Sequence, residues 1–479
     1  MNAPSPPRFL YQRIARDMRQ AIGSGVYPPG QRLPSVRQLA RQYRVSLSTA
    51  ILAYRNLEAA GWLEARPKSG HFARAAPRPP RAPEPAPTAS ATAPRDVSVG
   101  ALAMALVDET RAGELTRLGA AVPEADLLPL SALARHLAGT ARRRWQAPAS
   151  YEATRGNPLL RAQIARLMRD AGCNVLPEEV LVTNGCMEAL SLALLAVARP
   201  GETVAVESPT YFGVLQVIEA LGMRALEIAT HPRTGIEPDA LEQALAGHNI
   251  RACVLMPGFH NPLGACMPAA HKRRVVALLA ARGVPLIEDD VYGALSFASP
   301  RPPAAKAFDE DANIIYCASF SKTIAPAYRI GWAVPGRHLE RMVYLKFLRN
   351  LSTATPTQLA LADFLADGGF QRHLRRAVPR YRQRLEQIYH AIDRHFPPGT
   401  RYTQPEGGFL LWLELPASVD SVQLHREALS DNIAVTPGLI FSPAGQYRHH
   451  LRLSVGACAG EILHRAVASL GRRARQAAD

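Results

Sequence analysis

Five short apolar runs alternate with helical stretches between residues 180 and 316, and this alternation limits the fold to a few classes. The runs are rich in β-branched residues and cover positions 180–183, 203–206, 252–256, 284–287 and 314–316. Strands that are apolar along their whole length and separated by helices indicate a mostly parallel sheet, buried on both faces. Binding sites in such sheets form in the loops after the carboxyl ends of the strands. The residues directly after each run are therefore the first site candidates.

Several of these residues belong to types that bind anions, rings or charges. Gly185 turns the first run into a helix, and such a turn directs free backbone amides toward an anion. The carboxylate of Asp289 follows the fourth run, where its burial is costly unless it is paired. Other candidates after the runs are polar or aromatic, namely Tyr211, Asn261 and Tyr292. Each of these residues alone also fits an ordinary turn or core position.

The fifth run leads into Ser319-Phe320-Ser321-Lys322, and Arg329 follows seven positions after the lysine. A lysine amine attacks an aldehyde only when part of its population is neutral, and burial or nearby cations produce that state by lowering its pKa. Most lysines are solvated surface charges. The motif therefore gains its meaning from the residues around it.

A segment rich in proline and alanine, residues 75–99, divides the chain. It holds 7 prolines and 7 alanines in 25 residues and almost no large apolar side chain. Such a segment buries too little surface to offset its ordering entropy, so we expect an extended, semi-rigid spacer. A chain of 479 residues is expected to form two or three domains. We predict a head over 1–74 and a body over 100–479, with subdomains at about 150–345 and 346–479.

The head carries more than half of the excess positive charge. Residues 1–74 contain 12 Lys+Arg and 3 Asp+Glu, a net of +9, against +16 for the whole chain. A local excess of this kind favours a polyanionic partner such as nucleic acid. On charge alone, a basic domain without a partner is an equal alternative.

The head also has the pattern of a winged helix-turn-helix. A helical pattern over 11–22, an N-cap at Ser35 and a third helix from Ser46 or Ser48 precede two short strands at 62–66 and 71–73. The third helix of this plan enters the major groove. Its inward face is expected to hold Ile51, Tyr54, Leu57 and Ala60. Candidate contacts to bases or phosphates are Arg37, Arg41, Ser46, Ser48, Thr49, Lys68 and Gly70.

Residues 8–74 resemble the DNA-binding domain of the GntR regulators, most clearly in GVYPPGQRLPSVRQLARQYRVSLSTAILAYRNLEAAGWLEARPKSGHFA. The resemblance implies double-stranded operator DNA as a partner. Members of that family often carry arginines on the recognition helix where this chain has Leu47 and Leu52. These leucines are either core residues or contacts to thymine methyl groups.

Membrane, metal and disulfide classes receive no support from the sequence. No apolar run is long enough to span a bilayer, and the first 13 residues have no signal-peptide core. The expected location is the cytoplasm. The 6 cysteines are scattered without a C-x-x-C pair, which argues against a zinc site or a disulfide framework.

Taken in order, the motifs from about residue 100 to 475 resemble the fold-type I pyridoxal 5'-phosphate enzymes, the aspartate aminotransferase superfamily. The resemblance implies an α/β transferase fold with a mostly parallel central sheet and a smaller C-terminal α+β domain. It implies that Lys322 forms an aldimine with the cofactor, while Asp289 keeps the pyridine nitrogen protonated. Tyr292 and Asn261 would hydrogen-bond the phenolic oxygen, and Tyr211 would stack on the ring. The phosphate would bind Gly185, Cys186, Met187, Ser319, Ser321 and Arg329.

Two further positions concern the substrate or effector. Arg452, within Leu451-Arg452-Leu453-Ser454, corresponds to the arginine that clamps an α-carboxylate through two parallel hydrogen bonds. A surface arginine on an edge strand is the alternative. Ala121 begins a segment where the superfamily usually has glycine, and its methyl group would narrow the pocket.

A GntR-type head, a proline-rich linker and an aminotransferase-like body together define the MocR subfamily of transcriptional regulators. The resemblance implies a homodimer and an amino acid, amine or B6 vitamer acting at the cofactor site. The favoured hypothesis is a DNA-binding regulator that senses this effector through aldimine chemistry at Lys322. The alternatives are an active aminotransferase that acts on an α-amino acid, and a sensor of pyridoxal phosphate itself.

Overall fold

A computed structural model describes residues 9–23, 26–59, 61–66, 69–74, 81–109 and 115–478 of the chain. The chain divides into two compact units, Met1–Arg81 and Ala82–Asp479. None of the helices within these described ranges is long and apolar enough to cross a membrane.

Unit 1 is a winged helix-turn-helix, as the sequence predicted. Its elements are α1 (Leu10–Gly23), α2 (Val36–Tyr43), α3 (Leu47–Ala59) and the antiparallel pair β1 (Leu63–Arg66) and β2 (Gly70–Ala73). Ser35 caps α2 in a reciprocal capping box with Gln38, and Arg44 ends the helix in the left-handed conformation. Small and aliphatic side chains from all three helices form the core, among them Ile14, Met18, Leu39, Ala53 and Leu57.

One prediction about α3 was wrong. Ile51 was expected in the core but is 41% exposed, whereas Ala50, Ala53, Tyr54 and Leu57 are buried. Tyr54 and Leu57 are buried as expected, but Ala50 and Ala53 complete the buried face in place of Ile51. Ala60, the other residue expected to face inward, lies outside the described residues.

Unit 2 is built on an eight-stranded sheet with the order β3-β6-β5-β9-β10-β11-β12-β4. The neighbours from β6 to β11 pair in parallel, and β3 and β12 are antiparallel to theirs. This mostly parallel sheet confirms the predicted fold. Its strands are β3 (Arg95–Asp96), β4 (Leu181–Thr183), β5 (Thr203–Glu207), β6 (Arg224–Ile228), β9 (Ile250–Leu255), β10 (Leu286–Asp289), β11 (Ile314–Ser319) and β12 (Gly331–Val334).

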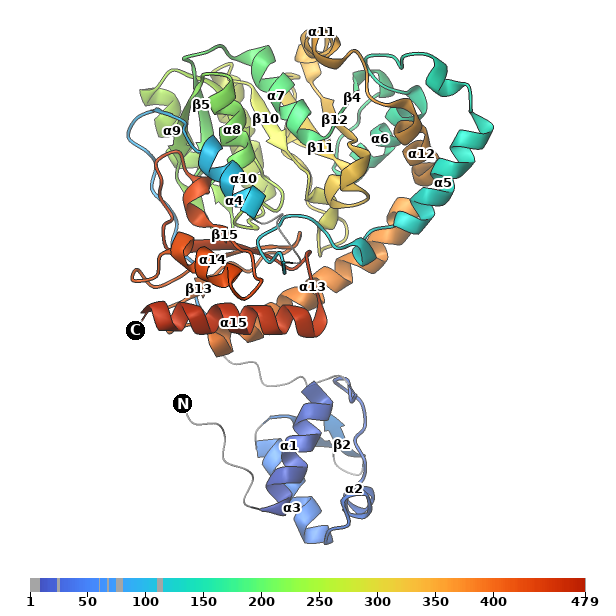
Figure 1. Ribbon diagram of the computed structural model, residues 1–479, viewed down its shortest axis with the longest axis vertical. Helices are drawn as coiled ribbons and strands as arrows, with labels where there is room; N and C mark the ends of the chain where they lie inside the picture. The colour runs from blue at the N-terminus through green and yellow to red at the C-terminus, as the bar shows by residue number, and fades with distance from the viewer. Residues whose placement is uncertain are drawn as a thin grey trace. The chain divides into compact units, whose positions relative to one another are not determined.

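Helices cover the central sheet, and one long helix extends toward a second, smaller sheet. Figure 1 shows α13 running from beside α5 to beside α15. The helices that precede the small sheet are α4 (Gly100–Glu109), α5 (Leu130–Arg143), α6 (Pro158–Asp170), α7 (Cys186–Val197), α8 (Phe212–Ala220), α9 (Pro238–Gly247), α10 (Ala269–Ala281), α11 (Leu339–Asn350), α12 (Thr355–Ala366) and α13 (Gly369–His395).

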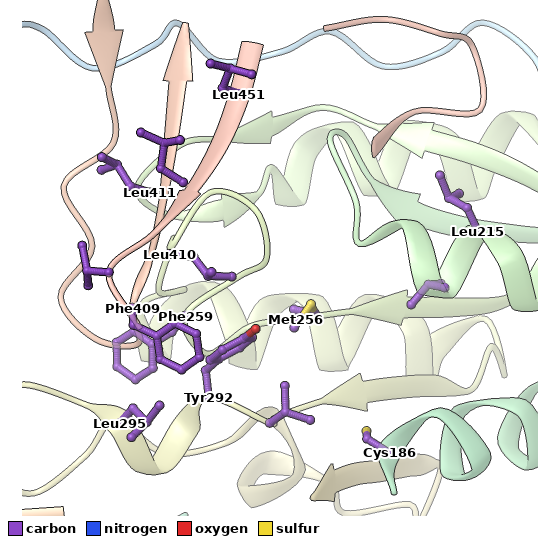
Figure 2. Close-up of a cluster of buried hydrophobic side chains, with 14 of the residues drawn as sticks. Cys186, Leu215, Met256, Phe259, Tyr292, Leu295, Phe409, Leu410, Leu411 and Leu451 are labelled. Atoms are coloured by element: carbon purple, nitrogen blue, oxygen red, sulfur yellow. The ribbon is translucent and has the colours of Figure 1, made fainter. Parts of the chain in front are cut away.

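The small sheet has the antiparallel order β13-β14-β16-β15. Its strands and the helices beside them in the chain are β13 (Arg401–Tyr402), β14 (Leu410–Glu414), α14 (Ser421–Leu429), β15 (Thr436–Pro437), β16 (His450–Ser454) and α15 (Gly460–Ala478). A separate antiparallel hairpin, β7 (Thr230–His231) and β8 (Gly235–Ile236), lies earlier in the chain. One apolar cluster joins the two sheets. Figure 2 shows Phe259 and Tyr292 beside Phe409, and the rings of Tyr292 and Phe409 meet edge to face with centroids 5.4 Å apart.

The second part of the proline-rich segment is bound to unit 2. Residues 82–99, which we call the strap, donate and accept hydrogen bonds along their length: the Pro83 carbonyl accepts from the Tyr402 amide (3.2 Å), and the Ala91 amide donates to the Glu227 carbonyl (2.8 Å). Within the strap, β3 pairs with the edge strand β6. The sequence predicts an extended, semi-rigid spacer over 75–99; residues 82–99 are instead hydrogen-bonded to unit 2, and residues 75–80 lie outside the described residues. An extended chain of small residues and prolines suits a sheet edge, because the prolines lie where no ladder bond is required.

Candidate functional site

A cavity of about 490 Å³ lies at the carboxyl ends of β10 and β11, between the central sheet and the small sheet. It is lined by residues that the sequence placed after five different strands or in the C-terminal region. These are Cys186, Met187, Tyr211, Asn261, Asp289, Tyr292, Ser319, Ser321, Lys322, Arg329 and Arg452. Gly185 adjoins them as the N-cap of α7. The structure therefore brings every residue predicted for the cofactor and the effector to one place.

Lys322 ends a short 3₁₀ turn, Phe320–Lys322, that follows β11. The Ser319 hydroxyl accepts the Ser321 amide, and the buried Phe320 ring packs on Trp332 with centroids 4.8 Å apart. These contacts fix the turn that carries the lysine. Nζ of Lys322 donates to the carbonyl of Ala121 at 2.7 Å. Burial, assisted by the positive charge of Arg452, lowers the pKa of Lys322 to about 8.

Asp289 is the last residue of β10 and is 2% exposed. Its Oδ1 accepts the Val291 amide at 3.3 Å and the thiol of Cys186 at 3.5 Å, which are weak contacts for a buried carboxylate. Burial raises the pKa of Asp289 to about 7, although the nearby Lys322 charge opposes this rise. A buried carboxylate with only weak hydrogen bonds is stabilised by any ligand that places a proton donor or a cation beside it.

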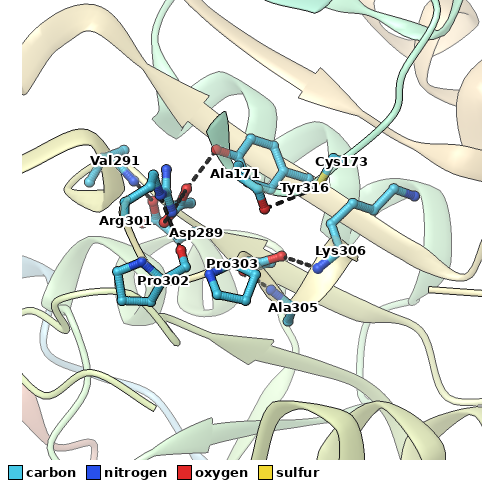
Figure 3. A network of polar contacts seen from close by, with 12 residues as sticks. Ala171, Cys173, Asp289, Val291, Arg301, Pro302, Pro303, Ala305, Lys306 and Tyr316 are labelled. Carbon is cyan, nitrogen blue, oxygen red and sulfur yellow. Dashed lines mark hydrogen bonds and ion pairs between the residues drawn. The ribbon is translucent and has the colours of Figure 1, made fainter. Parts of the chain in front are cut away.

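The neighbouring carboxylate, Asp290, is satisfied by protein groups. Arg301 donates to both of its oxygens (2.8 and 3.0 Å), and the Tyr316 hydroxyl donates to Oδ2 at 2.7 Å. Figure 3 shows this network around Arg301 and Tyr316. Of two adjacent buried acids, only Asp289 therefore faces the cavity without a strong partner.

Two polar atoms beside Asp289 and Lys322 have no hydrogen-bond partner among the described residues. They are the hydroxyl of Tyr292 and Nε of Arg452, and both residues are almost fully buried. Buried polar groups are rarely left unpaired in folded proteins. These two atoms therefore indicate that a ligand with polar oxygens belongs in the cavity.

The N-terminus of α7 forms an anion cradle. Gly185 caps this helix without a side-chain hydrogen bond and has φ of +89°, and a Cβ there would collide with Nη2 of Arg329. Arg329 donates to the Asn184 carbonyl at 2.9 Å and approaches the Ser321 hydroxyl at 3.5 Å. The first amides of a helix, a guanidinium and a hydroxyl are the groups that bind phosphate.

Arg452 on β16 is a buried guanidinium that makes no ion pair with any carboxylate in the described ranges. It is 3% exposed, and it donates to Oδ1 of Asn261 (3.0 Å) and to the Gly119 carbonyl (2.7 Å). The rings of Phe441 and Phe212 lie 5.2 and 5.8 Å from its Cζ atom. A buried charge without a counter-ion is costly, and a bound anion would offset that cost.

Sequence reasoning missed the backbone and aromatic partners of these side chains. The Gly119 carbonyl, Phe212 and Thr436 surround Arg452, and no motif marks them. Ala121 was predicted to narrow the pocket through its methyl group. It lines the cavity, and its carbonyl also holds Lys322.

In unit 1, Arg37 and Arg41 are exposed on α2, and Ser46 caps α3 by accepting the Thr49 amide at 3.2 Å. Gly70 has φ of +103° and lies beside the side chain of Arg32. The Ser46 hydroxyl also hydrogen-bonds the hydroxyls of Ser48 and Thr49. Lys68, also predicted to contact DNA, lies outside the described residues. Leu47 and Leu52 are exposed, so the core alternative for these leucines is wrong.

Two family models match the chain. Residues 128–470 match the aminotransferase class I and II family, and residues 10–72 match the gntR family of bacterial regulatory proteins. The two matches fall on the two structural units. They agree with the winged helix-turn-helix and with the parallel sheet.

Similar proteins include regulators and transaminases. The HTH-type transcriptional regulator YjiR of Escherichia coli (strain K12) is 37% identical over 461 residues, which cover 96% of this chain and 98% of that protein. The 2-aminoadipate transaminase of Thermus thermophilus is 33% identical over 355 residues, covering 73% and 88%. The crystal structure of LysN, an α-aminoadipate aminotransferase of the same organism, has a TM-score of 0.71 at 31% identity, covering 79% and 94%. The chain therefore belongs to the MocR subfamily of GntR regulators, in which a winged helix-turn-helix is fused to an aminotransferase of fold type I.

Proposed function

We propose that the chain is a transcriptional regulator of the cytoplasm that depends on pyridoxal 5'-phosphate. Unit 1 binds operator DNA, and the cavity of unit 2 binds the cofactor together with an amino acid, amine or B6 vitamer. One observation carries this proposal: the same chain joins a basic winged helix-turn-helix to a cavity with a half-buried lysine, an anion cradle and a buried arginine that lacks a counter-ion among the described residues.

The residues present fit pyridoxal phosphate. When bound, this cofactor supplies an aldehyde that condenses reversibly with amines and a ring that accepts electrons. Lys322 would hold the aldehyde carbon, and Asp289 would hold a proton on the ring nitrogen. The unpaired hydroxyl of Tyr292 and the amide of Asn261 suit the phenolic oxygen. The remaining contacts would be Tyr211 against the ring and the cradle of Gly185, Cys186, Met187, Ser319, Ser321 and Arg329 around the phosphate.

The lowered pKa of Lys322 makes its amine available at neutral pH. Roughly a tenth of an amine with a pKa of about 8 is neutral at pH 7, against about 0.03% for an ordinary lysine with a pKa of 10.5. An effector amine would compete with this lysine for the cofactor aldehyde. Arg452 would take the effector carboxylate in exchange for its present contacts with Asn261 and Gly119.

The strap provides a route by which unit 2 reports to the DNA-binding unit. Near its start, the strap is bonded to the small sheet, since Glu84 Oε1 accepts the Gln404 amide at 3.1 Å. Farther along, Thr88 donates to the Ser208 carbonyl at 2.7 Å, and β3 joins the central sheet. A movement of the small sheet relative to the central sheet would pull on the residues that connect to unit 1. Such a movement shifts DNA binding only by the effector's differential affinity for the two arrangements.

A homodimer is part of the proposal. Helix α11 presents three exposed apolar residues at positions i, i+3 and i+4, namely Tyr344, Phe347 and Leu348, and the exposed Leu351 follows as its C-cap. A stripe with this spacing covers one side of a helix and marks an interaction surface. A monomeric mass in solution at micromolar concentration would contradict this part.

A working aminotransferase is the second candidate, and the 33% identity to the 2-aminoadipate transaminase favours it. The decisive experiment incubates purified full-length protein, loaded with pyridoxal phosphate, with single amino acids and 2-oxoglutarate. Oxo-acid formation and affinity for the DNA upstream of the chain's own gene are measured in parallel. An amino acid that changes DNA affinity without turnover supports the regulator. Rapid turnover without DNA binding refutes it and supports the enzyme.

Two variants complete this experiment. Lys322→Arg keeps the positive charge and removes the primary amine, while Lys322→Ala removes both. Both should lose the visible absorption of covalently held cofactor and the response to the effector, yet bind DNA. A response to pyridoxal phosphate alone, unaffected by any amino acid, would instead support a sensor of the cofactor.

A further inference from the structure

The outward face of α3 carries three aliphatic side chains in its first two turns. Leu47, Ile51 and Leu52 are 50%, 41% and 49% exposed. Leu47 and Ile51 are four positions apart and so are neighbours on the helix surface, and Leu52 lies about 100° farther around the helix. The side opposite Leu52, with Ala50 and Leu57, packs in the core of unit 1. The apolar patch is therefore additional to the surface that folding requires.

The polar side chains at the start of α3 are engaged with one another. The Ser46 hydroxyl accepts the Thr49 amide and lies 2.9 Å from the Ser48 hydroxyl and 2.8 Å from that of Thr49. No arginine, lysine, asparagine or glutamine occurs on α3 before Arg55. The first two turns thus lack the side chains that read guanine or adenine through paired hydrogen bonds.

The charge around the patch identifies its partner as a polyanion. Arg37, Arg41 and Arg44 are exposed on the adjacent helix and at its end. In a winged helix-turn-helix this helix enters the major groove, and DNA presents phosphates on both sides of that groove. In that groove, the apolar feature of a base pair is the 5-methyl group of thymine.

We propose that Leu47, Ile51 and Leu52 read thymine methyl groups, so that the operator carries A·T pairs where the first two turns of α3 enter the major groove. This inference rests on the proposed DNA-binding function. Thymine methyl groups would thus take the place that guanine has for a recognition helix with arginines.

The test uses the full-length protein and the duplex that it protects within the DNA upstream of its own gene. Each thymine of the duplex is replaced by deoxyuridine, which removes only the methyl group, and affinity is measured by fluorescence anisotropy at constant salt. Replacement at a contacted position should weaken binding about fourfold, the effect expected for one methyl group that is buried on binding. Each of the variants Leu47→Ala and Leu52→Ala should bind the thymine and deoxyuridine duplexes equally at the base that the replaced leucine contacts. Both residues are exposed, so folding should be unaffected.

Arg37→Ala serves as the matched control, because a lost phosphate contact weakens binding to every duplex and leaves the deoxyuridine penalty unchanged. Equal affinity for thymine and deoxyuridine duplexes would overturn the inference while leaving DNA binding intact. A leucine variant that changes the protein's mass in solution but not its DNA affinity would overturn it as well. Failure to bind any duplex would instead refute the proposed function.

Discussion

Replacing Asp289 by asparagine should stabilise the cofactor-free protein at alkaline pH. The carboxyl is 2% exposed and has only weak hydrogen bonds from Val291 and Cys186, and its pKa is raised from 3.8 to about 7. A carboxyl with a raised pKa binds its proton more tightly in the folded than in the unfolded state. Its contribution to stability is therefore present at low pH and is lost as the pH rises toward 7.

The size of this effect follows from the two pKa values. At about 1.4 kcal/mol per pH unit, a rise from 3.8 to about 7 corresponds to an upper limit of about 4 kcal/mol at pH 8. The substituted asparagine would be neutral at every pH, and its amide oxygen can still accept the Val291 amide. Near pH 5 the folded wild type is itself protonated, so the advantage of Asp289→Asn should fall to less than half.

The assay is urea unfolding of both proteins without cofactor at pH 5, 6, 7 and 8, followed by circular dichroism. Asp311→Asn, the same substitution at an exposed position, is the matched control. Added pyridoxal phosphate should reverse the order, because Asp289 then has a partner and the variant does not. A variant that is no more stable than the wild type at pH 8, or a difference that stays constant from pH 5 to 8, would refute the reasoning.

Three further changes test other parts of unit 2. Gly185→Ala should cost about 1 kcal/mol or more and weaken cofactor retention, since its φ is +89° and its Cβ would meet Arg329; urea unfolding and dialysis measure the two effects. Arg452→Lys should weaken binding of an amino-acid effector at least tenfold, about 1.4 kcal/mol, but leave that of its decarboxylated amine unchanged, as calorimetry would show. Glu84→Ala removes the ion pair with Arg233, so limited proteolysis within the strap should accelerate; an unchanged rate would contradict the strap's attachment.

The alternation of apolar runs and helices was sufficient to predict the central sheet, because strands buried on both faces must be apolar along their length. The same reasoning located the site, since Asp289 and Lys322 lie at the ends of β10 and β11. Their chemical roles came from a family resemblance. Neither hydropathy nor spacing distinguishes a lysine that could hold a cofactor from any other lysine.

Other features could not be predicted because their signals are shared by different structures. Proline occurs both in linkers and in segments that lie on a sheet edge, so the composition predicts a spacer where the structure has the strap. Ile51 has a helical spacing from Tyr54 that suits the core, but the small Ala50 and Ala53 set the buried face instead. The carbonyls of Gly119 and Ala121 bind Arg452 and Lys322 through the backbone, which leaves no trace in residue type.

The effector binding proposed for Arg452 would change a contact between the two sheets of unit 2. The arginine belongs to β16 of the small sheet, while Asn261 follows β9 of the central sheet. A carboxylate that takes both guanidinium nitrogens would release this contact between the two sheets. Shifting an equilibrium a hundredfold needs about 2.7 kcal/mol of differential affinity. Hydrogen bonds to charged groups contribute about 1.5–3 kcal/mol each, so two bonds made in only one arrangement are sufficient.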